Sequence, residues 1–249
     1  MNPSDVGPAG RGEGGPAPRD SRSAELAAAL EAVEARIAAA CSAAGRDRAG
    51  VTLVVVTKTY PAADVARLAA LGVRDVGENR EQEGSAKHAE CAGLPLAWHF
   101  IGQLQTNKAR SVSGWADLVH SLDRPALVAA LDRGAARAGR VIDCLLQVSL
   151  DDDPARGGVP VPQLPALAEA VAAAPALRLR GVMAVAPLDA DPHAAFAALP
   201  GLLDQVRRIE PGADVISAGM SGDLEAAVAF GATHLRVGTA VLGRRPPLR

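Results

Sequence analysis

Short apolar runs alternate with helix-like segments from Val51 onward, and this alternation restricts the possible folds more than any other feature of the chain. The run Val51–Val56 is continuous and mostly β-branched, which is typical of a strand buried on both faces of a parallel sheet. Eight such runs occur, at Val51–Val56, Val73–Val76, Trp98–Ile101, Leu118–Val119, Val141–Val148, Leu177–Val185, Asp214–Ile216 and His234–Val237. Strands that alternate strictly with helices form a parallel sheet with right-handed crossovers.

The segments between these runs have helical spacing. The clearest are Asp64–Leu71, Asn79–Glu90, Pro125–Ala138, Gln163–Ala174, Pro192–Ile209 and Asp223–Phe230, and a weaker one covers Leu104–Val112. About 25 residues per strand and helix, over roughly 200 residues, fit a lean (β/α)8 barrel of the TIM type. The alternative is an open doubly wound sheet, but no GxGxxG follows the first strand and no P-loop is present. We therefore expect an α/β fold with a closed barrel.

The segment before the first strand divides into two parts. Residues 1–22 are rich in Gly and Pro and nearly lack large apolar side chains, so we expect a disordered tail. From Ser23, the expected N-cap, Leu26, Leu30, Val33 and Ile37 recur at helical spacing until a glycine at position 45. The predicted organisation is thus a tail over 1–22 and a single barrel domain over 23–249 with an extra N-terminal helix.

Charge and cysteine usage exclude several classes of protein. A net charge of −2 argues against non-specific binding to nucleic acid or to an anionic membrane. The three cysteines form no CxxC pair, which indicates neither a disulfide framework nor a structural zinc site. The first twenty residues lack the apolar core of a signal peptide, and no apolar run is long enough to span a bilayer. We expect a cytoplasmic protein with no nucleic-acid or membrane partner and no metal, as a monomer or weak dimer.

Lysine is rare in this chain. Only three of the 26 basic residues are lysines, Lys58, Lys87 and Lys108, so each raises the question of whether its site needs an amine. Active sites of (β/α)8 barrels lie at the carboxyl ends of the strands, and Lys58 is the second residue after the first buried run. Partial loss of water there favours the neutral amine, which can attack a carbonyl group. The alternative is an ordinary rim lysine that reaches solvent.

The loops after the last two strands resemble a phosphate site. They contain Ser217, Gly219, Ser221, Gly222, Gly238 and Thr239. Glycines let backbone N–H groups approach an anion, hydroxyls add donors, and we expect Ser221 to cap the following helix. The alternative is two ordinary Gly-containing turns. A carbonyl group for Lys58 and a phosphate for these loops together describe pyridoxal 5′-phosphate (PLP), with Arg236 placed to meet its pyridine nitrogen.

At these residues the sequence resembles a known family. The motifs VVVTKTYP, GENREQE, WHFIGQLQTNK, VHSLDR, DPARGG, GVMAV, SAGMSGDLEAAV and HLRVGTAVLG occur in this order. They resemble the PLP homeostasis protein family, also called YggS-type or proline synthase co-transcribed proteins. The resemblance implies an alanine-racemase-like PLP-binding barrel in which Lys58 holds the cofactor as an internal aldimine.

The resemblance also implies the remaining site residues. Ser217, Gly238 and Thr239 would hold the phosphate together with backbone near Met220 and Ser221. Arg236 would face the ring nitrogen, and Asn79 would lie near the ring. Two positions depart from the family pattern, because Tyr60 and Arg156 stand where many members have lysines. This puts any role of those amines in cofactor transfer in doubt.

The resemblance implies a protein that buffers PLP and supplies it to apoenzymes, without turnover. Racemases of this fold class need a tyrosine base on the opposite face of the substrate, supplied by a second domain. Tyr60 is the only tyrosine and lies two residues from Lys58, and we expect no second domain, so that base is missing. One alternative is a minimal PLP-dependent racemase or decarboxylase that uses the same lysine. Another is a barrel aldolase whose Lys58 condenses with a phosphorylated sugar.

Other polar residues have simpler interpretations. We expect His99 and His120 to be hydrogen-bonded barrel residues, because both occur in predicted strands. Lys87 follows Glu83 by four residues, which predicts an ion pair on an exposed helix face. Lys108 lies at the rim after the third strand and is a weaker candidate for the site than Lys58.

Overall fold

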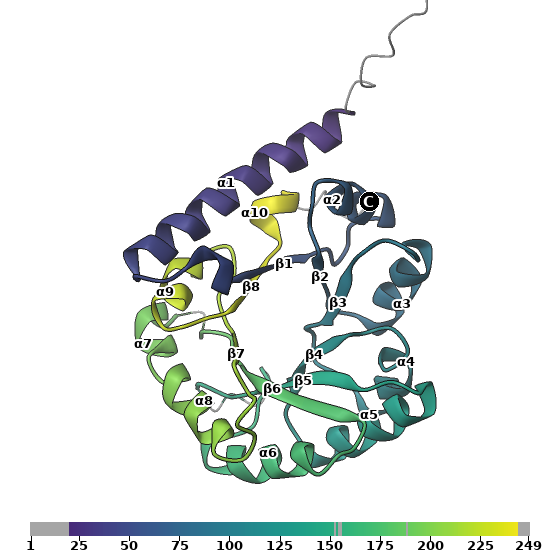
Figure 1. Cartoon of the computed structure of the whole chain (residues 1–249), viewed down its shortest axis with the longest axis vertical. Coiled ribbons are helices and arrows are strands. Elements are labelled where there is room, and N and C mark those ends of the chain that lie inside the picture. Colours follow the sequence, from purple (N-terminus) through teal and green to yellow (C-terminus); the bar gives the residue numbers. More distant parts are fainter. Residues whose placement is uncertain (1–19, 152, 154–155, 188, 244–249) are drawn as a thin grey trace, which may run out of the picture.

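The computed structural model describes residues 20–151, 153, 156–187 and 189–243. Eight parallel strands close into a barrel in sequence order, as predicted, and Figure 1 shows the ring of strands inside a layer of helices. The strands are β1 (Thr52–Val56), β2 (Asp75–Glu78), β3 (Ala97–Phe100), β4 (Leu118–Leu122), β5 (Ile142–Gln147), β6 (Leu177–Met183), β7 (Val215–Ser217) and β8 (His234–Val237). The ring closes where β1 pairs with β8, with Val54 opposite Arg236.

The helices occupy the outside of this ring. They are α1 (Ser21–Ala43), α2 (Ala62–Ala70), α3 (Glu81–Glu90), α4 (Ala109–Val112), α5 (Pro125–Ala138), α6 (Leu164–Ala172), α7 (Pro192–Phe196), α8 (Leu199–Arg207), α9 (Leu224–Ala229) and α10 (Thr239–Leu242). Three 3-10 turns accompany them, η1 (Arg48–Gly50), η2 (Thr106–Lys108) and η3 (Val161–Gln163). Within the described ranges, no helix is long and apolar enough to cross a membrane.

All eight predicted strands are present, but several predicted boundaries are wrong. β2 lies two residues later than the predicted Val73–Val76, and β7 continues through Ser217 beyond the predicted Ile216. β4 continues through His120 and Ser121 to Leu122, because both polar side chains are buried and His120 is hydrogen-bonded to other buried residues of the barrel. The single helix predicted over Pro192–Ile209 is divided into α7 and α8. Pro200 lies in the first turn of α8, and proline is accommodated at a helix start but not in a helix interior.

The N-terminal helix begins earlier than predicted. α1 starts at Ser21, and the carboxylate of Asp20 accepts a hydrogen bond of 2.7 Å from the backbone N–H of Ser23, so Asp20 is the N-cap. The part of the predicted tail over 1–19 lies outside the described residues. The predicted apolar stripe of α1 is buried, from Leu26 to Ile37, and α1 lies across α9 and α10 in Figure 1.

The apolar core has two unequal parts. A large part lies between the strands and the surrounding helices and includes the stripe of α1. A small, separate cluster inside the barrel contains only Leu118, Leu145, Met183 and Val215, with Val185 packed against it. Much of the barrel interior is therefore filled by polar side chains, which the buried polar residues His99, His120, Ser217 and Arg236 provide.

Candidate functional site

The turn after β1 presents Lys58 at the carboxyl end of the barrel. β1 ends at Val56, and the backbone N–H of Tyr60 donates to the carbonyl of Thr57 at 3.1 Å, which closes a tight turn around Lys58. Thr59 has a φ of 70°, a left-handed conformation that a β-branched residue adopts only when surrounding contacts hold it there. Its N–H donates to the carboxylate of Glu83, which provides such a contact.

A pocket of about 230 Å³ lies beside this turn. Its lining consists of Val56, Lys58, Ile101, Met220, Ser221, Gly222, Arg236, Gly238 and Thr239. The structure therefore brings together six of the eight residues predicted for the site. Lys58 is partly buried, and its amine has no hydrogen-bond or ion-pair partner among the described residues. An amine placed in this way is free to react with a ligand in the pocket.

The loops after β7 and β8 form the wall opposite Lys58. The oxygen of Ser221 accepts a hydrogen bond of 3.3 Å from the backbone N–H of Ala240, so its hydroxyl proton remains for a ligand. Ser221 does not cap α9 as predicted, because the helix begins at Leu224 and Asp223 is at its N-cap position. A side chain on Gly238 would lie 3.2 Å from the carbonyl of Val56, so glycine allows the loop after β8 to pack closely against the end of β1.

The backbone donors of these loops are not all free. The N–H of Met220 donates to the carboxylate of Asp223 at 2.5 Å, so the predicted backbone contact from Met220 cannot use this group. The N–H groups of Ser221 and Gly222 have no partner in the described part of the chain. The backbone donors of positions 221 and 222, which line the pocket, therefore remain available to a ligand.

Arg236 is a buried cation without a counter-ion. Its side chain reaches the pocket from β8, with only 5% of the residue exposed. Nη1 donates to the hydroxyl oxygen of Ser217 at 2.6 Å, and Nη2 donates to the carbonyl of Ala184 at 2.9 Å. Burial lowers the pKa of Arg236 to about 10, and no carboxylate among the described residues lies within ion-pair distance. A buried, unpaired charge is costly and favours a site for an electron-rich ligand.

Two of the eight predicted residues do not line this pocket. Ser217 is fully buried beneath it, at the end of β7. Asn79 lines a neighbouring pocket of about 460 Å³, between the loops after β2 and β3. The lining of that second pocket is Asn79, Arg80, Glu81, Gln82, Glu83, Phe100, Gln103, Leu104, Gln105 and Lys108. The predicted rim position of Lys108 therefore belongs to the neighbouring pocket.

His99 and His120 are hydrogen-bonded barrel residues, as expected. Their rings are linked at 2.9 Å between Nδ1 of His99 and Nε2 of His120. Burial, followed by the nearby His99, Arg236 and His234, lowers the pKa of His120 well below its ordinary value. Burial and His99 also lower the pKa of His234, to about 4. The histidines near Arg236 thus avoid adding further positive charge to the barrel interior.

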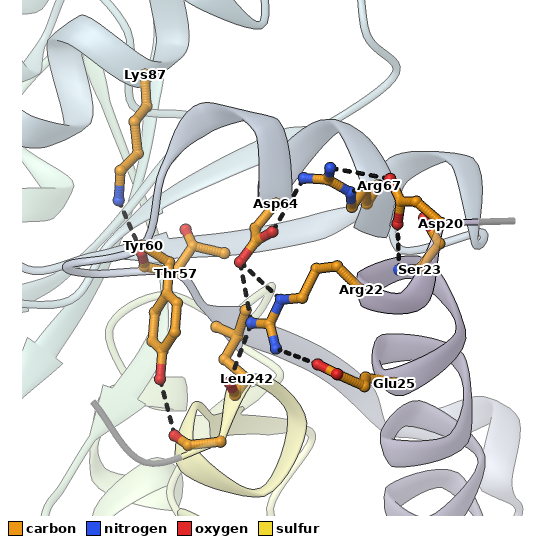
Figure 2. A network of polar contacts seen from close by, with 11 residues as sticks. Asp20, Arg22, Ser23, Glu25, Thr57, Tyr60, Asp64, Arg67, Lys87 and Leu242 are labelled. Carbon is orange, nitrogen blue, oxygen red and sulfur yellow. Dashed lines mark hydrogen bonds and ion pairs between the residues drawn. The ribbon is translucent and has the colours of Figure 1, made fainter. Parts of the chain in front are cut away.

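The prediction of an exposed Lys87 is wrong. The ion pair with Glu83 exists, at 2.7 Å, but Lys87 is only 6% exposed and also contacts Glu78 at 2.9 Å and the carbonyl of Thr57 at 2.7 Å. Figure 2 shows the Lys87 amine directed at Thr57. A spacing of four residues along a helix suits an exposed ion pair as well as a buried one. The sequence therefore did not reveal that Lys87 contacts Glu78, Glu83 and the Lys58 turn.

Glu78 completes the cluster around Lys87. The hydroxyl of Thr57 donates to Oε1 of Glu78 at 2.5 Å, while Oε2 is buried without a partner in the described structure. Burial raises the pKa of the Glu78 carboxyl, and the hydrogen bonds from Lys87 and Thr57 oppose this shift only in part. Glu78, Glu83 and Lys87 therefore hold the Lys58 turn through hydrogen bonds to Thr57 and Thr59, and none of the three lines the Lys58 pocket.

The two residues that replace family lysines make structural contacts. The hydroxyl of Tyr60 donates to the carbonyl of Gly243 at 2.8 Å, and Figure 2 shows it directed at the chain after α10. Nη2 of Arg156 donates to the carbonyls of Val185 and Ala186 at 3.0 and 2.6 Å, which ties the loop after β5 to the loop after β6. Neither side chain lines the Lys58 pocket.

Fold and pocket together define a class of protein: a closed (β/α)8 barrel in which a lysine after β1 faces glycine- and hydroxyl-bearing loops after β7 and β8. Residues 29–246 match the family model of the alanine racemase N-terminal domain. The pyridoxal phosphate homeostasis protein of Mycobacterium bovis is 45% identical over 244 residues, covering 90% of this chain and 94% of the relative. The chain therefore belongs to the pyridoxal phosphate homeostasis protein family, which confirms the resemblance carried by its motifs.

Further relatives and solved structures agree with this membership. The homeostasis protein of Pseudomonas aeruginosa is 44% identical over 220 residues, covering 88% of this chain and 96% of the relative. PipY of Synechococcus elongatus, solved with PLP bound, is 36% identical with a TM-score of 0.77, covering 88% of this chain and all of PipY. Alanine racemase from Corynebacterium glutamicum, at 18% identity and a TM-score of 0.65 over 88% of this chain and 63% of the racemase, shares the fold.

Proposed function

We propose that this protein binds PLP as an internal aldimine on Lys58, buffers the cofactor in the cytoplasm and supplies it to apoenzymes. One observation carries the proposal: an unpartnered amine and a buried, unpaired guanidinium line the same pocket. The family membership supports it, because relatives are named pyridoxal phosphate homeostasis proteins and PipY was solved with PLP bound.

The pocket offers a chemical partner to each part of PLP. The cofactor supplies an aldehyde, which an unprotonated lysine amine can bind covalently. Ser221 and Thr239 offer hydroxyls to the phosphate, and the free N–H groups at positions 221 and 222 add two further donors. Arg236 offers N–H donors to the pyridine nitrogen, and its missing counter-ion leaves it free to do so.

Two features bear on the choice between a carrier and an enzyme. A guanidinium can only donate hydrogen bonds, so Arg236 would keep the pyridine nitrogen unprotonated and weaken the ring as an electron sink, which argues against transamination but not against racemisation. The hydroxyl of Tyr60 is already bound to the carbonyl of Gly243, and Tyr60 is the only tyrosine in the sequence. No tyrosine of this chain is thus available as a second base on the face opposite Lys58.

Borohydride reduction of the PLP-loaded protein, followed by peptide mass spectrometry, tests the binding site. We expect a pyridoxyl adduct on Lys58 and loss of the visible absorption band in Lys58→Ala. Lys108→Ala is the matched control, because Lys108 lines the neighbouring pocket and pairs with Glu81 at 3.3 Å. An adduct confined to Lys87 or Lys108 would contradict the assignment.

Two measurements separate the carrier from the enzyme. We expect the PLP-loaded protein to restore activity to a PLP-dependent apoenzyme, and we expect no exchange of α-hydrogen for deuterium in a panel of amino acids. Exchange that depends on Lys58 would instead support the minimal racemase or decarboxylase. A colourless protein that traps a phosphorylated sugar on reduction would support the aldolase.

A further inference from the structure

A chain of buried polar groups crosses the barrel interior and ends at Arg236. Asp75, at the start of β2, lies 3.0 Å from Nε2 of His99, and Nδ1 of His99 lies 2.9 Å from Nε2 of His120. Nδ1 of His120 lies 2.9 Å from the hydroxyl of Ser217, whose oxygen lies 2.6 Å from Nη1 of Arg236. Five strands contribute one residue each, and the last four residues are all buried.

When both histidines are neutral, the two ends of this chain determine the direction of its hydrogen bonds. An ionised carboxylate only accepts, so Asp75 requires a proton on Nε2 of His99. A neutral imidazole has one donor and one acceptor, so Nδ1 of His99 accepts from Nε2–H of His120. Nδ1 of His120 must then accept from the hydroxyl of Ser217, and Arg236, which only donates, donates a hydrogen bond to the Ser217 oxygen.

Neutral histidines are the arrangement that this environment favours. A second proton on His99 would reverse every bond up to Ser217 and would place an imidazolium in the same interior as the unpaired Arg236. His120 and His234, whose rings lie near His99, are themselves held neutral by burial. The direction from Arg236 towards Asp75 satisfies every polar atom of the chain without a further buried charge.

This direction has a consequence for Ser217. A hydroxyl has one proton, and that of Ser217 is used by His120. Ser217 therefore has no proton to donate to a phosphate, whose oxygens are themselves acceptors. Ser217 also does not line the Lys58 pocket, whereas Ser221 does. Ser217 and Ser221, which both belong to the SAGMS segment, therefore have different roles.

We propose that Asp75, His99 and His120 form a relay that turns the Ser217 oxygen towards Arg236, so that Ser217 is a positioning residue for the guanidinium and not a phosphate ligand. The carbonyl of Ala184 holds the second terminal nitrogen of Arg236, so the two contacts together fix the plane of the guanidinium. That the oriented guanidinium donates to a pyridine nitrogen rests on the proposed function. The direction of the hydrogen bonds in the relay does not.

The relay itself is tested in the ligand-free wild-type protein by NMR of the histidine ring nitrogens. We expect His99 and His120 to be neutral at pH 7 with the proton on Nε2. Signals are assigned with single His→Gln variants, and the exposed His193 serves as the reference for an ordinary ring. An imidazolium at His99, or a proton on Nδ1 of His120, would overturn the relay whether or not PLP binds.

The role of Ser217 is tested by comparing two probes, PLP and pyridoxal, which lacks the phosphate. We expect Ser217→Ala to weaken both by a similar factor, about tenfold, as for the loss of one hydrogen bond. The matched variant Ser221→Ala should weaken PLP alone. A loss confined to PLP in Ser217→Ala would make Ser217 a phosphate ligand and overturn the proposal. A wild-type protein that binds neither probe would instead contradict the proposed function.

Discussion

Lys87 and Arg236 are both buried cations near the carboxyl end of the barrel, but their surroundings differ. Lys87 is in contact with the carboxylates of Glu78 and Glu83 and with a backbone carbonyl. Arg236 is in contact only with a hydroxyl and a backbone carbonyl, both neutral. Lys87 is 6% exposed and Arg236 is 5% exposed, so burial alone does not distinguish them.

The difference in counter-ions separates a structural charge from one that is available to a ligand. The charge of Lys87 is more than balanced by the protein itself, and the cluster around it holds the turn that carries Lys58. No carboxylate in the described structure pairs with Arg236, and the more distant Asp223 offsets the cost of burying its charge only in part, so an electron-rich group that enters the pocket would lower that cost. Four experiments test this difference between Lys87 and Arg236, from the largest expected effect to the smallest.

Removing the Lys87 amine should have the largest effect on stability. Lys87→Met leaves two carboxylates close together in a buried site, and we expect the free energy of unfolding to fall by about 3–5 kcal/mol. Denaturant unfolding of the ligand-free protein measures this. The control is Lys108→Met, which breaks the more exposed pair with Glu81 and should cost less than about 1 kcal/mol. Equal costs for the two variants would mean that Lys87 is not the centre of a buried cluster.

Removing the Arg236 guanidinium should affect binding more than stability. Arg236→Met deletes a buried charge that has no counter-ion, so the ligand-free protein should lose little stability while its affinity for PLP falls about 10- to 100-fold. Titration of PLP absorbance and denaturant unfolding measure the two effects. Arg180→Met, which removes an arginine paired with Asp143 and Asp214, should leave affinity unchanged. A loss of stability as large as that in Lys87→Met would remove the distinction between the two cations.

Acid should destabilise the protein through the histidines near Arg236. The pKa of His234 is lowered to about 4, so below pH 6.5 the unfolded chain takes up a proton before the folded one does. Stability that is present above pH 6.5 is then lost as the pH falls towards 4, by up to about 1.4 kcal/mol per pH unit for each such histidine. Unfolding measured from pH 6.5 to 5 should show a smaller slope in His234→Gln. His193→Gln, at an exposed position, should leave the slope unchanged.

Arg22 provides a cation of intermediate burial and the smallest expected effect. It pairs with the buried carboxylate of Asp64 at 2.9 Å and donates to the carbonyl of Leu242, while Arg67 contacts the same carboxylate, as Figure 2 shows. Because Arg67 remains, we expect Arg22→Met to cost only about 1 kcal/mol. Arg178→Met, at an exposed pair with Asp143, should cost less still. A cost for Arg22→Met near that of Lys87→Met would show that Arg67 does not compensate for its loss.

The strand order and the position of Lys58 could be predicted from the sequence, because both depend on local patterns. Apolar runs of strand length reveal the barrel, and a lysine two residues after such a run is necessarily at its carboxyl end. The contrast between Lys87 and Arg236 could not be predicted in this way. α3 is a polar helix, so nothing in its composition shows that Lys87 is one of its buried residues.

The separation of Ser217 from Ser221 depends on a strand boundary that the sequence leaves open. Both serines belong to one Gly-containing segment, and a hydroxyl in either position suits a phosphate site. The structure extends β7 through Ser217, which directs this side chain into the barrel interior, whereas Ser221 follows in the loop. Strand ends are set by pairing with neighbouring strands, here β8, and that pairing is not local in sequence.

The pairing of β1 with β8 has a consequence for how the protein is made. The ribosome releases Lys58 well before positions 220–239, which the pocket also needs. A nascent chain that lacks β8 and the loop after it has an open barrel and a pocket without Arg236, Gly238 and Thr239. A ligand can therefore bind in the complete Lys58 pocket only after β8 has paired with β1. A protein with this pocket occupied has a closed barrel.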